Sequence, residues 1–190
     1  MPRDVLSAAH MGSDAPSDPR LLAFVADLTP TGTQRETWPS GVVLDITGYL
    51  TERLPPMDLV SGVRAILRKG DAVLAFDEPE GTHILPGGRI EAGESPLDAL
   101  VRELREECAC TVAAEPRLIG FLRFRHVTPK DERYRYPYPD FLQLIYVAET
   151  IDDPLEGSDE PLVLRPRFVP LSEMHRLPLA PAERGLLRAL

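Results

Sequence analysis

The sequence has no apolar run that approaches the length of a membrane-spanning helix, and its first residues lack the apolar core of a signal peptide. We therefore expect a cytoplasmic protein without a membrane partner. Cysteine is scarce: the only two, Cys108 and Cys110, lie too close together for a useful disulfide. We expect both to be small buried apolar residues in a reducing compartment.

Positive charge is also in short supply. The chain has 21 Lys and Arg against 30 Asp and Glu, a net charge of -9, which argues against a surface that coats nucleic acid, so no nucleic-acid partner is expected. An acidic protein that acts on a polyanion would need cations at its site. The length of 190 residues, with 43% hydrophobic residues, suits one globular domain with an appendage.

Residues 96–108 are predicted to form a helix. Ser95 is of the type that caps a helix N-terminus, Pro96 suits the first helical position, and Asp98 stands where a capping-box acid would. Spacings of three and four residues predict an apolar stripe that faces the core. Its members are Leu97, Leu100, Val101, Leu104 and Cys108.

Three glutamates, Glu103, Glu106 and Glu107, cluster on another flank of this helix. Their mutual repulsion, close to a helix C-terminus where the dipole also disfavours negative charge, calls for a positive partner. Arg102 and Arg105 are one candidate, which would give an ordinary salt-bridged surface. A divalent cation is the other, because Mg²⁺ prefers carboxylate oxygens and keeps open positions for water and phosphate. The helix by itself does not decide between the two.

The spacing around the helix is more specific. Gly88 is followed after five residues by Glu94, and after seven more by Arg-Glu-Leu-Arg-Glu-Glu at 102–107, with apolar Cys110 three residues beyond. This stretch resembles the Nudix box, Gly-x5-Glu-x7-Arg-Glu-apolar-x-Glu-Glu-x-Gly-apolar, the signature of the Nudix hydrolases. Ala109 departs from it, because the box has glycine there, which would help the chain leave the helix in a left-handed conformation.

The resemblance implies hydrolysis of a nucleoside diphosphate linked to another moiety, with Mg²⁺ or alternatively Mn²⁺ as cofactor. It implies metal ligation by Glu103, Glu106, Glu107 and the carbonyl of Gly88. Arg102 matches the arginine that orients the neighbouring glutamate, and Glu94 matches a supporting acid at the turn. Glu103 is the first choice for the base that takes a proton from water, with Glu106 beside it as a further catalytic acid. Loop acids are alternatives: Asp131, Glu132 and Asp140.

Substrate selection is expected in residues 123–140, where arginines and tyrosines alternate. Arg123 and Arg125 share one strand face, and a loop with Arg133 and Tyr136 can clamp phosphates and stack a base. The alternative is that the tyrosines cover the core edge and the arginines pair with surface acids. His83 and His126 are expected to be packed or exposed rather than catalytic. The window 126–128 matches neither the dinucleoside polyphosphate nor the ADP-ribose subtype.

Strand and helix patterns complete the prediction. We expect a tail at 1–20, an N-terminal extension at 21–58 with a short helix (21–28) and a strand (42–47), and a Nudix domain at 59–190. Further strands are predicted at 59–67, 72–76, 118–126, 141–148 and 167–171, with a helical turn capped by Ser172 and a closing helix at 181–190. Strands on both sides of a central helix suggest an α/β/α sandwich around a mixed sheet. The resemblance to the Nudix hydrolases implies the same fold.

Two functional hypotheses follow. The first is a metal-dependent Nudix pyrophosphohydrolase, whose partner is a nucleoside diphosphate-linked small molecule. The second is a catalytically silent Nudix-fold module that binds a nucleotide metabolite and regulates another process. The intact set of glutamates favours the enzyme, since a silent module has no reason to keep mutually repelling carboxylates. Many Nudix proteins pair as homodimers, so a homodimer is one expectation for the assembly.

Overall fold

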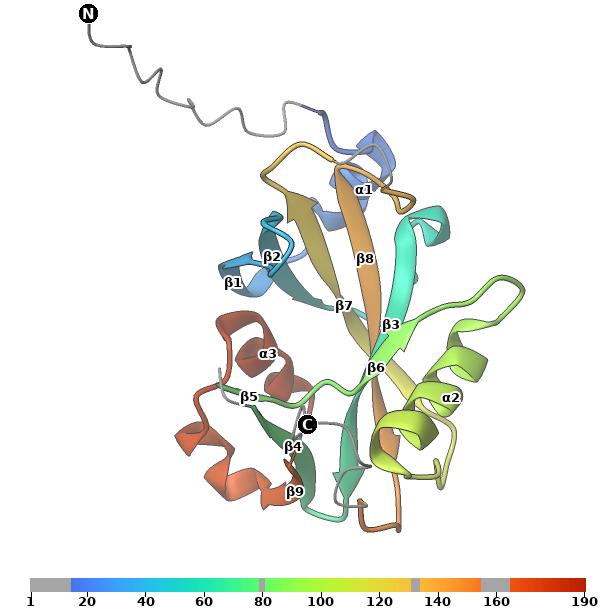
Figure 1. The fold of residues 1–190 in the computed structure, drawn as a ribbon, viewed down its shortest axis with the longest axis vertical. Helices are drawn as coiled ribbons and strands as arrows, with labels where there is room; N and C mark the ends of the chain where they lie inside the picture. The colour runs from blue at the N-terminus through green and yellow to red at the C-terminus, as the bar shows by residue number, and fades with distance from the viewer. Residues whose placement is uncertain (1–14, 79–80, 131–133, 155–164) are drawn as a thin grey trace, which may run out of the picture.

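The computed structural model describes residues 15–78, 81–130, 134–154 and 165–190, and Figure 1 shows their arrangement. The helices, including short 3-10 helices (η), and the strands are, in chain order, α1 (Pro19–Val25), β1 (Pro30–Thr37), β2 (Val43–Leu50), η1 (Met57–Leu59), β3 (Val60–Lys69), β4 (Ala72–Glu78), β5 (Gly81–His83), β6 (Gly87–Arg89), α2 (Pro96–Cys108), β7 (Arg117–His126), β8 (Asp140–Glu149), β9 (Arg165–Pro170), η2 (Leu171–Arg176), α3 (Pro181–Leu186) and η3 (Leu187–Ala189).

The described strands join in one mixed sheet. Seven of its nine strands follow the order β1-β2-β7-β8-β3-β4-β5, while β6 pairs with β3 and β9 pairs with β4. β3 and β8 are parallel, and the pairs on either side of them, such as β2 with β7 and β4 with β9, are antiparallel. Parallel neighbours need a long crossover connection. Here that connection contains α2, which lies beside β6 in Figure 1.

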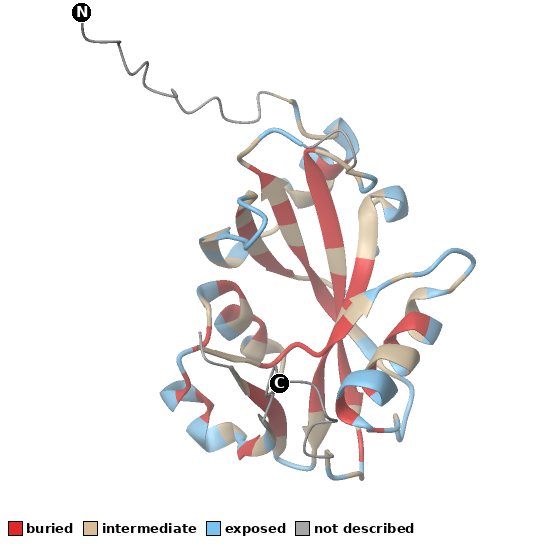
Figure 2. Ribbon diagram, in the orientation of Figure 1, coloured by how far each residue is buried: buried red, intermediate tan, exposed pale blue. Residues whose placement is uncertain are grey.

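Helices cover both faces of the sheet. One cluster of buried side chains joins α3 to the strands through Ala182 and Leu186, and a second joins α1 and α2 to them through Leu21, Leu100 and Leu104. Figure 2 shows buried residues concentrated along the central strands between these helices. The fold is therefore α/β, with helices on both faces of a mixed sheet, as predicted. None of the described helices is both long and apolar enough to cross a membrane.

The N-terminal section is part of this sheet. The predicted strand at 42–47 is confirmed as β2, and the predicted helix at 21–28 is α1, which ends earlier at Val25. Sequence analysis missed β1, a strand of mostly polar residues at the edge of the sheet. The burial of β1 alternates between exposed and partly covered residues, but its side chains are mostly polar, so no apolar periodicity marks it in the sequence. The division at residue 58 stays a prediction, although the sheet continues across it through β2 and β7.

Three local predictions differ from the structure. Val101 was predicted to lie on the apolar stripe of α2 but is 37% exposed, because Leu100, Leu104 and Cys108 follow one another at four-residue spacing and centre the buried face one position away. Ser172 does not cap the following turn, which starts at Leu171 without a side-chain cap. The closing helix is α3 followed by the short η3, and Leu186 is fully buried within it.

The predicted tail also differs where the structure describes it. The side chain of Asp18 caps α1 by accepting a hydrogen bond from the Arg20 amide at 2.7 Å, and Ser17 contacts arginines of β7. Residues 1–14 lie outside the described part of the chain. Cys108 and Cys110 are free and buried, as predicted. Burial raises the pKa of both thiols, so they remain in the neutral, unreactive form.

Candidate active site

Helix α2 starts and ends as the box spacing predicts. The Ser95 hydroxyl accepts a hydrogen bond from the Asp98 amide at 3.2 Å, and Pro96 occupies the first turn. At the other end Ala109 is left-handed, with φ 56°. Its N–H donates to the Arg105 carbonyl at 3.1 Å. The exit of the chain is thus the one expected for glycine, which alanine adopts at a cost of roughly 1 kcal/mol.

Arg102, in the middle of this helix, is the centre of an ion-pair network. Its guanidinium donates to both carboxylate oxygens of Glu94, at 2.8 and 3.0 Å, which lowers the pKa of Glu94. It also donates to Glu103 at 2.8 Å and to Glu106 at 3.2 Å. A further bond, at 3.0 Å, reaches the Arg89 carbonyl. One guanidinium therefore fastens the glycine-rich turn to the helix and orients two of the three clustered acids.

Two of the three box glutamates, Glu103 and Glu107, lie against strand β6. Glu103 has a 14% exposed side chain and packs so closely on Gly88 that a Cβ there would fall 2.4 Å from its Oε1. Glu107 accepts a hydrogen bond from the Gly87 amide at 2.8 Å. Burial raises the pKa of Glu107, and the nearby charges of Glu103 and Glu106 act in the same direction. Only glycine at position 88 leaves room for this packing.

These oxygen donors fit a hard divalent cation. Glu103 and Glu107 flank the strand that carries the predicted carbonyl ligand of Gly88, and no nitrogen or sulfur ligand competes in the predicted set. Within the described ranges, however, no three His, Cys, Asp or Glu side chains converge closely enough to hold a metal ion by themselves. Glu106 points outward, with a 60% exposed side chain. The ligand set of Gly88, Glu103, Glu106 and Glu107 therefore stays a prediction.

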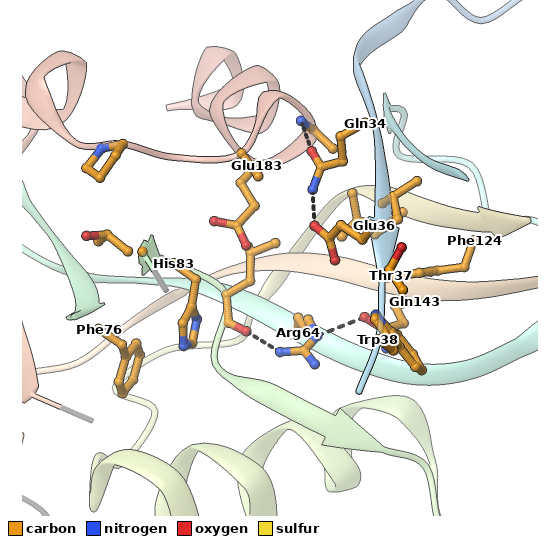
Figure 3. Close-up of a pocket in the computed structure, with 18 of the residues that line it drawn as sticks. Gln34, Glu36, Thr37, Trp38, Arg64, Phe76, His83, Phe124, Gln143 and Glu183 are labelled. Atoms are coloured by element: carbon orange, nitrogen blue, oxygen red, sulfur yellow. Dashed lines mark hydrogen bonds between the residues drawn. The ribbon is translucent and has the colours of Figure 1, made fainter. Parts of the chain in front are cut away.

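A cavity of about 770 Å³ opens beside this network, in the size range of small-molecule sites. Figure 3 shows its centre, where Arg64 of β3 donates to Gln143 of β8 at 2.8 Å and to the Leu85 carbonyl at 2.6 Å. Glu107 is the box glutamate that lines the cavity. The aromatic residues on its walls are Trp38, Phe76, His83 and Phe124.

Of the four residues predicted to contact the substrate, the structure describes three, and none of these three lines the cavity. Arg123 and Arg125 pair with the buried Asp140, at 2.7 and 3.3 Å, on the face of β7 opposite Phe124, and neither lines the cavity. Tyr136 stacks under the guanidinium of Arg89, 4.7 Å from its ring centre. Arg133, together with Asp131 and Glu132, lies outside the described residues. The substrate-binding roles of Arg123, Arg125, Arg133 and Tyr136 stay predictions.

Several cavity residues were not singled out in the sequence. Arg64 could have been recognised as a candidate site residue from the sequence, because it interrupts the apolar run of β3. A charged side chain in a largely buried strand is costly unless it has a partner or a function. Gln34, Glu36 and Trp38 carried no such signal. They come from the unpredicted strand β1 and the turn after it, and their place at the cavity depends on how the whole sheet assembles.

Comparisons with known proteins agree with the box. The family model for the NUDIX domain matches residues 58–190. A curated relative, the uncharacterized Nudix hydrolase YvcI of Bacillus subtilis, is 26% identical over 123 residues, which cover 64% of this chain and 73% of YvcI. The chain belongs to the Nudix family.

Solved structures with a similar chain path include two bacterial proteins. The Bacillus subtilis pyrophosphohydrolase BsRppH matches with a TM-score of 0.47 and 19% identity, covering 72% of this chain and 77% of that one. The MutT protein from Bacillus halodurans matches with a TM-score of 0.49 and 24% identity, covering 67% and 78%.

Proposed function

We propose that this protein is a metal-dependent hydrolase that cleaves the pyrophosphate bond of a nucleoside diphosphate derivative by attack of water at phosphorus. Family membership supports a hydrolase that acts on pyrophosphate bonds. The observation that carries the proposal is the position of Glu107. Its carboxylate accepts a hydrogen bond from the Gly87 amide in the glycine turn of the box, and the residue also lines the cavity that contains Arg64.

The residues divide the chemistry between them. Gly88, Glu103, Glu106 and Glu107 would hold Mg²⁺ or Mn²⁺, which when bound neutralises phosphate oxygens and makes water more nucleophilic. Arg102 fixes the carboxylate of Glu103 at 2.8 Å, so that this group is positioned to take the proton of the attacking water. Asp140, an alternative base in the sequence, has a side chain that is only 1% exposed and is held by two arginines. The Glu103 side chain is 14% exposed, which favours Glu103.

Arg64 is assigned to the phosphates. It is the one Lys or Arg among the described residues that line the cavity, and its two hydrogen bonds to Gln143 and to the Leu85 carbonyl hold the guanidinium in place. A guanidinium has five N–H groups in a fixed plane, which suits binding to phosphate oxygens. Arg64 would thus bind the substrate next to the predicted metal site without belonging to the box.

A substrate panel tests the proposal. Purified protein is incubated with Mg²⁺ and a series of nucleoside diphosphate derivatives, and release of nucleoside monophosphate or phosphate is measured. We expect turnover of at least one member, which is lost with EDTA and restored by Mg²⁺ or Mn²⁺. The second hypothesis, a silent binding module, predicts tight binding of a member of the panel without turnover of any. That outcome would overturn the hydrolase assignment.

A further inference from the structure

One wall of the cavity is built by a segment that precedes the matched family domain. Gln34, Glu36 and Trp38 line the cavity from β1 and the residue that follows it, whereas the family match starts at residue 58. Alternate residues of a strand share a face and lie about 6.6 Å apart. The three side chains therefore form a row along one side of the cavity, and Figure 3 shows them facing it.

This wall is held rigidly against the C-terminal helix. A Cβ on Gly32 would lie 2.0 Å from the Pro181 carbonyl oxygen, and one on Gly185 would lie 2.5 Å from that of Thr31, so β1 and α3 are in direct backbone contact. The Ala182 amide donates to the Gln34 side chain at 2.9 Å, and Gln34 in turn donates to Glu36 at 2.6 Å. Both ends of the Gln34 amide are thereby used in positioning the carboxylate of Glu36.

The cavity is lined by one cation, Arg64, which binds phosphates in the proposed function, and by three acids, Glu36, Glu107 and Glu183. Glu36 belongs to the β1 wall, and a second phosphate group placed there would meet a carboxylate instead of a cation. The group that sits on this wall is therefore uncharged or a donor of hydrogen bonds. Trp38, a residue that is 40% exposed, adds a flat apolar surface for a planar group.

We propose that the β1 wall binds the base of the substrate and selects guanine over adenine. A carboxylate only accepts hydrogen bonds and has two oxygens to do so. The guanine edge offers adjacent N–H donors at N1 and N2, whereas adenine has an acceptor at N1, which a carboxylate repels. Glu36 reads this edge while the ring stacks on Trp38. The inference rests on the proposed function, because that function puts the diphosphate at Arg64 and hence the base away from it.

Binding of non-hydrolysable ligands tests the inference separately from catalysis. Trp38 is the only tryptophan of the chain, so its fluorescence reports directly on this wall. The α,β-methylene analogues of GDP and ADP are titrated in Mg²⁺, with calorimetry as a second measure of affinity. We expect the GDP analogue to bind at least 10-fold more tightly and to change the Trp38 emission, since a site built to bond a donor rejects an analogue that lacks it.

Variants locate the selectivity. Glu36→Gln is expected to reduce the ratio of the two affinities to about twofold or less, because the amide replaces one acceptor oxygen by a donor. The matched control is Glu52→Gln, which removes an exposed glutamate far from the cavity and should keep the wild-type ratio. Circular dichroism checks that both variants are folded. Equal affinities in the wild-type protein, or a guanine preference that survives Glu36→Gln, would overturn the inference.

The two proposals fail in different ways. If the substrate panel shows no turnover but the GDP analogue binds more tightly and Glu36→Gln removes this preference, the hydrolase assignment is wrong. The proposed role of the β1 wall then stands. If nucleotides are hydrolysed in Mg²⁺ but guanine and adenine derivatives bind equally well, the hydrolase assignment stands and base selection by the β1 wall is wrong. If neither analogue binds to the wild-type protein, the proposed role of the β1 wall is wrong, whatever the substrate panel shows.

Discussion

Helix α2 and the β1 wall face the same cavity but owe their structure to different kinds of contact. In the first, Ser95, Glu94 and Arg102 bond to partners no more than 13 residues away in the chain. In the second, Gln34 depends on the Ala182 amide, 148 positions away in the chain. The box is a local structure that a sequence pattern specifies. The wall is formed only when β1 meets α3, near the other end of the chain, and we infer that substrate choice resides there.

The largest expected effect concerns the glutamates of helix α2. Glu107→Gln and Glu106→Gln should each lower turnover by ~10²–10⁴-fold, because each removes a predicted ligand of the cation that neutralises the phosphates. The free energy of unfolding should not fall, since both changes also relieve repulsion among clustered acids. Turnover on the best panel substrate and urea unfolding measure the two quantities. Glu115→Gln, at an exposed loop position, is the control, and wild-type rates in both site variants would refute the metal assignment.

The next effect separates two roles for the arginines of β7. Asp140 has a 1% exposed side chain and holds both Arg123 and Arg125. Asp140→Asn should lower the free energy of unfolding by about 3 kcal/mol, because it leaves the largely buried Arg123 and the partly exposed Arg125 without their shared counter-charge. Arg123→Gln should act in the same direction and leave KM unchanged. A raised KM with wild-type stability would instead support the predicted substrate-binding role of Arg123.

The non-local wall can be broken at its tightest contact. Gly185→Ala places a methyl group 2.5 Å from the Thr31 carbonyl oxygen, a distance that real side chains do not tolerate. We expect a loss of about 1–3 kcal/mol in the free energy of unfolding and weaker binding of the guanine ligand at Trp38. Urea unfolding and Trp38 fluorescence follow these quantities. Unchanged stability would show that β1 is not held by α3.

A pH effect of moderate size should come from His126. The residue is 2% exposed, packs against Tyr134, Tyr138 and Phe141, and has no hydrogen-bond partner on either ring nitrogen in the described chain. Burial lowers its pKa, while the charge of Asp140 raises it in part. The unfolded chain, with a pKa near 6.5, therefore binds a proton first as the pH falls.

Stability should consequently decrease as the pH drops below about 6.5, by about 1.4 kcal/mol for each unit that separates the two pKa values. Unfolding in urea between pH 7.5 and 5 measures the slope. In His126→Leu the free energy of unfolding should change less over this pH range than it does in the wild-type protein. An identical slope in the two proteins would contradict the assignment to this histidine.

The smallest effect is a gain. Ala109→Gly removes the cost of a left-handed alanine at the end of α2, although glycine also makes the unfolded chain more flexible. We expect the free energy of unfolding to rise by about 0.5–1 kcal/mol, with turnover unchanged. The same replacement at Ala114, a position without a positive φ, should not raise the free energy of unfolding. Equal responses at the two positions would show that the conformation of Ala109 carries no strain.

Prediction from sequence succeeded where determinants are close together in the chain. The capped start of α2 depends on residues a few positions apart. The left-handed exit at Ala109 was not predicted, because the box has glycine there. Prediction also failed for β1, because a polar edge strand has no periodic pattern, and for the cavity, because Arg64 and Glu36 converge only through the sheet. The box residues could be named in advance, and the residues we infer to set specificity could not.

The pairing of β2 with β7 has a practical consequence for any shortened version of this protein. A fragment that starts at residue 58, where the family match begins, would keep α2 and its glutamates but lose the strand that pairs with β7 at seven positions. The uncovered backbone of β7 would then be free to add a strand from another molecule. Such a fragment is expected to self-associate, and negative results from it would say little about the activity of the full chain.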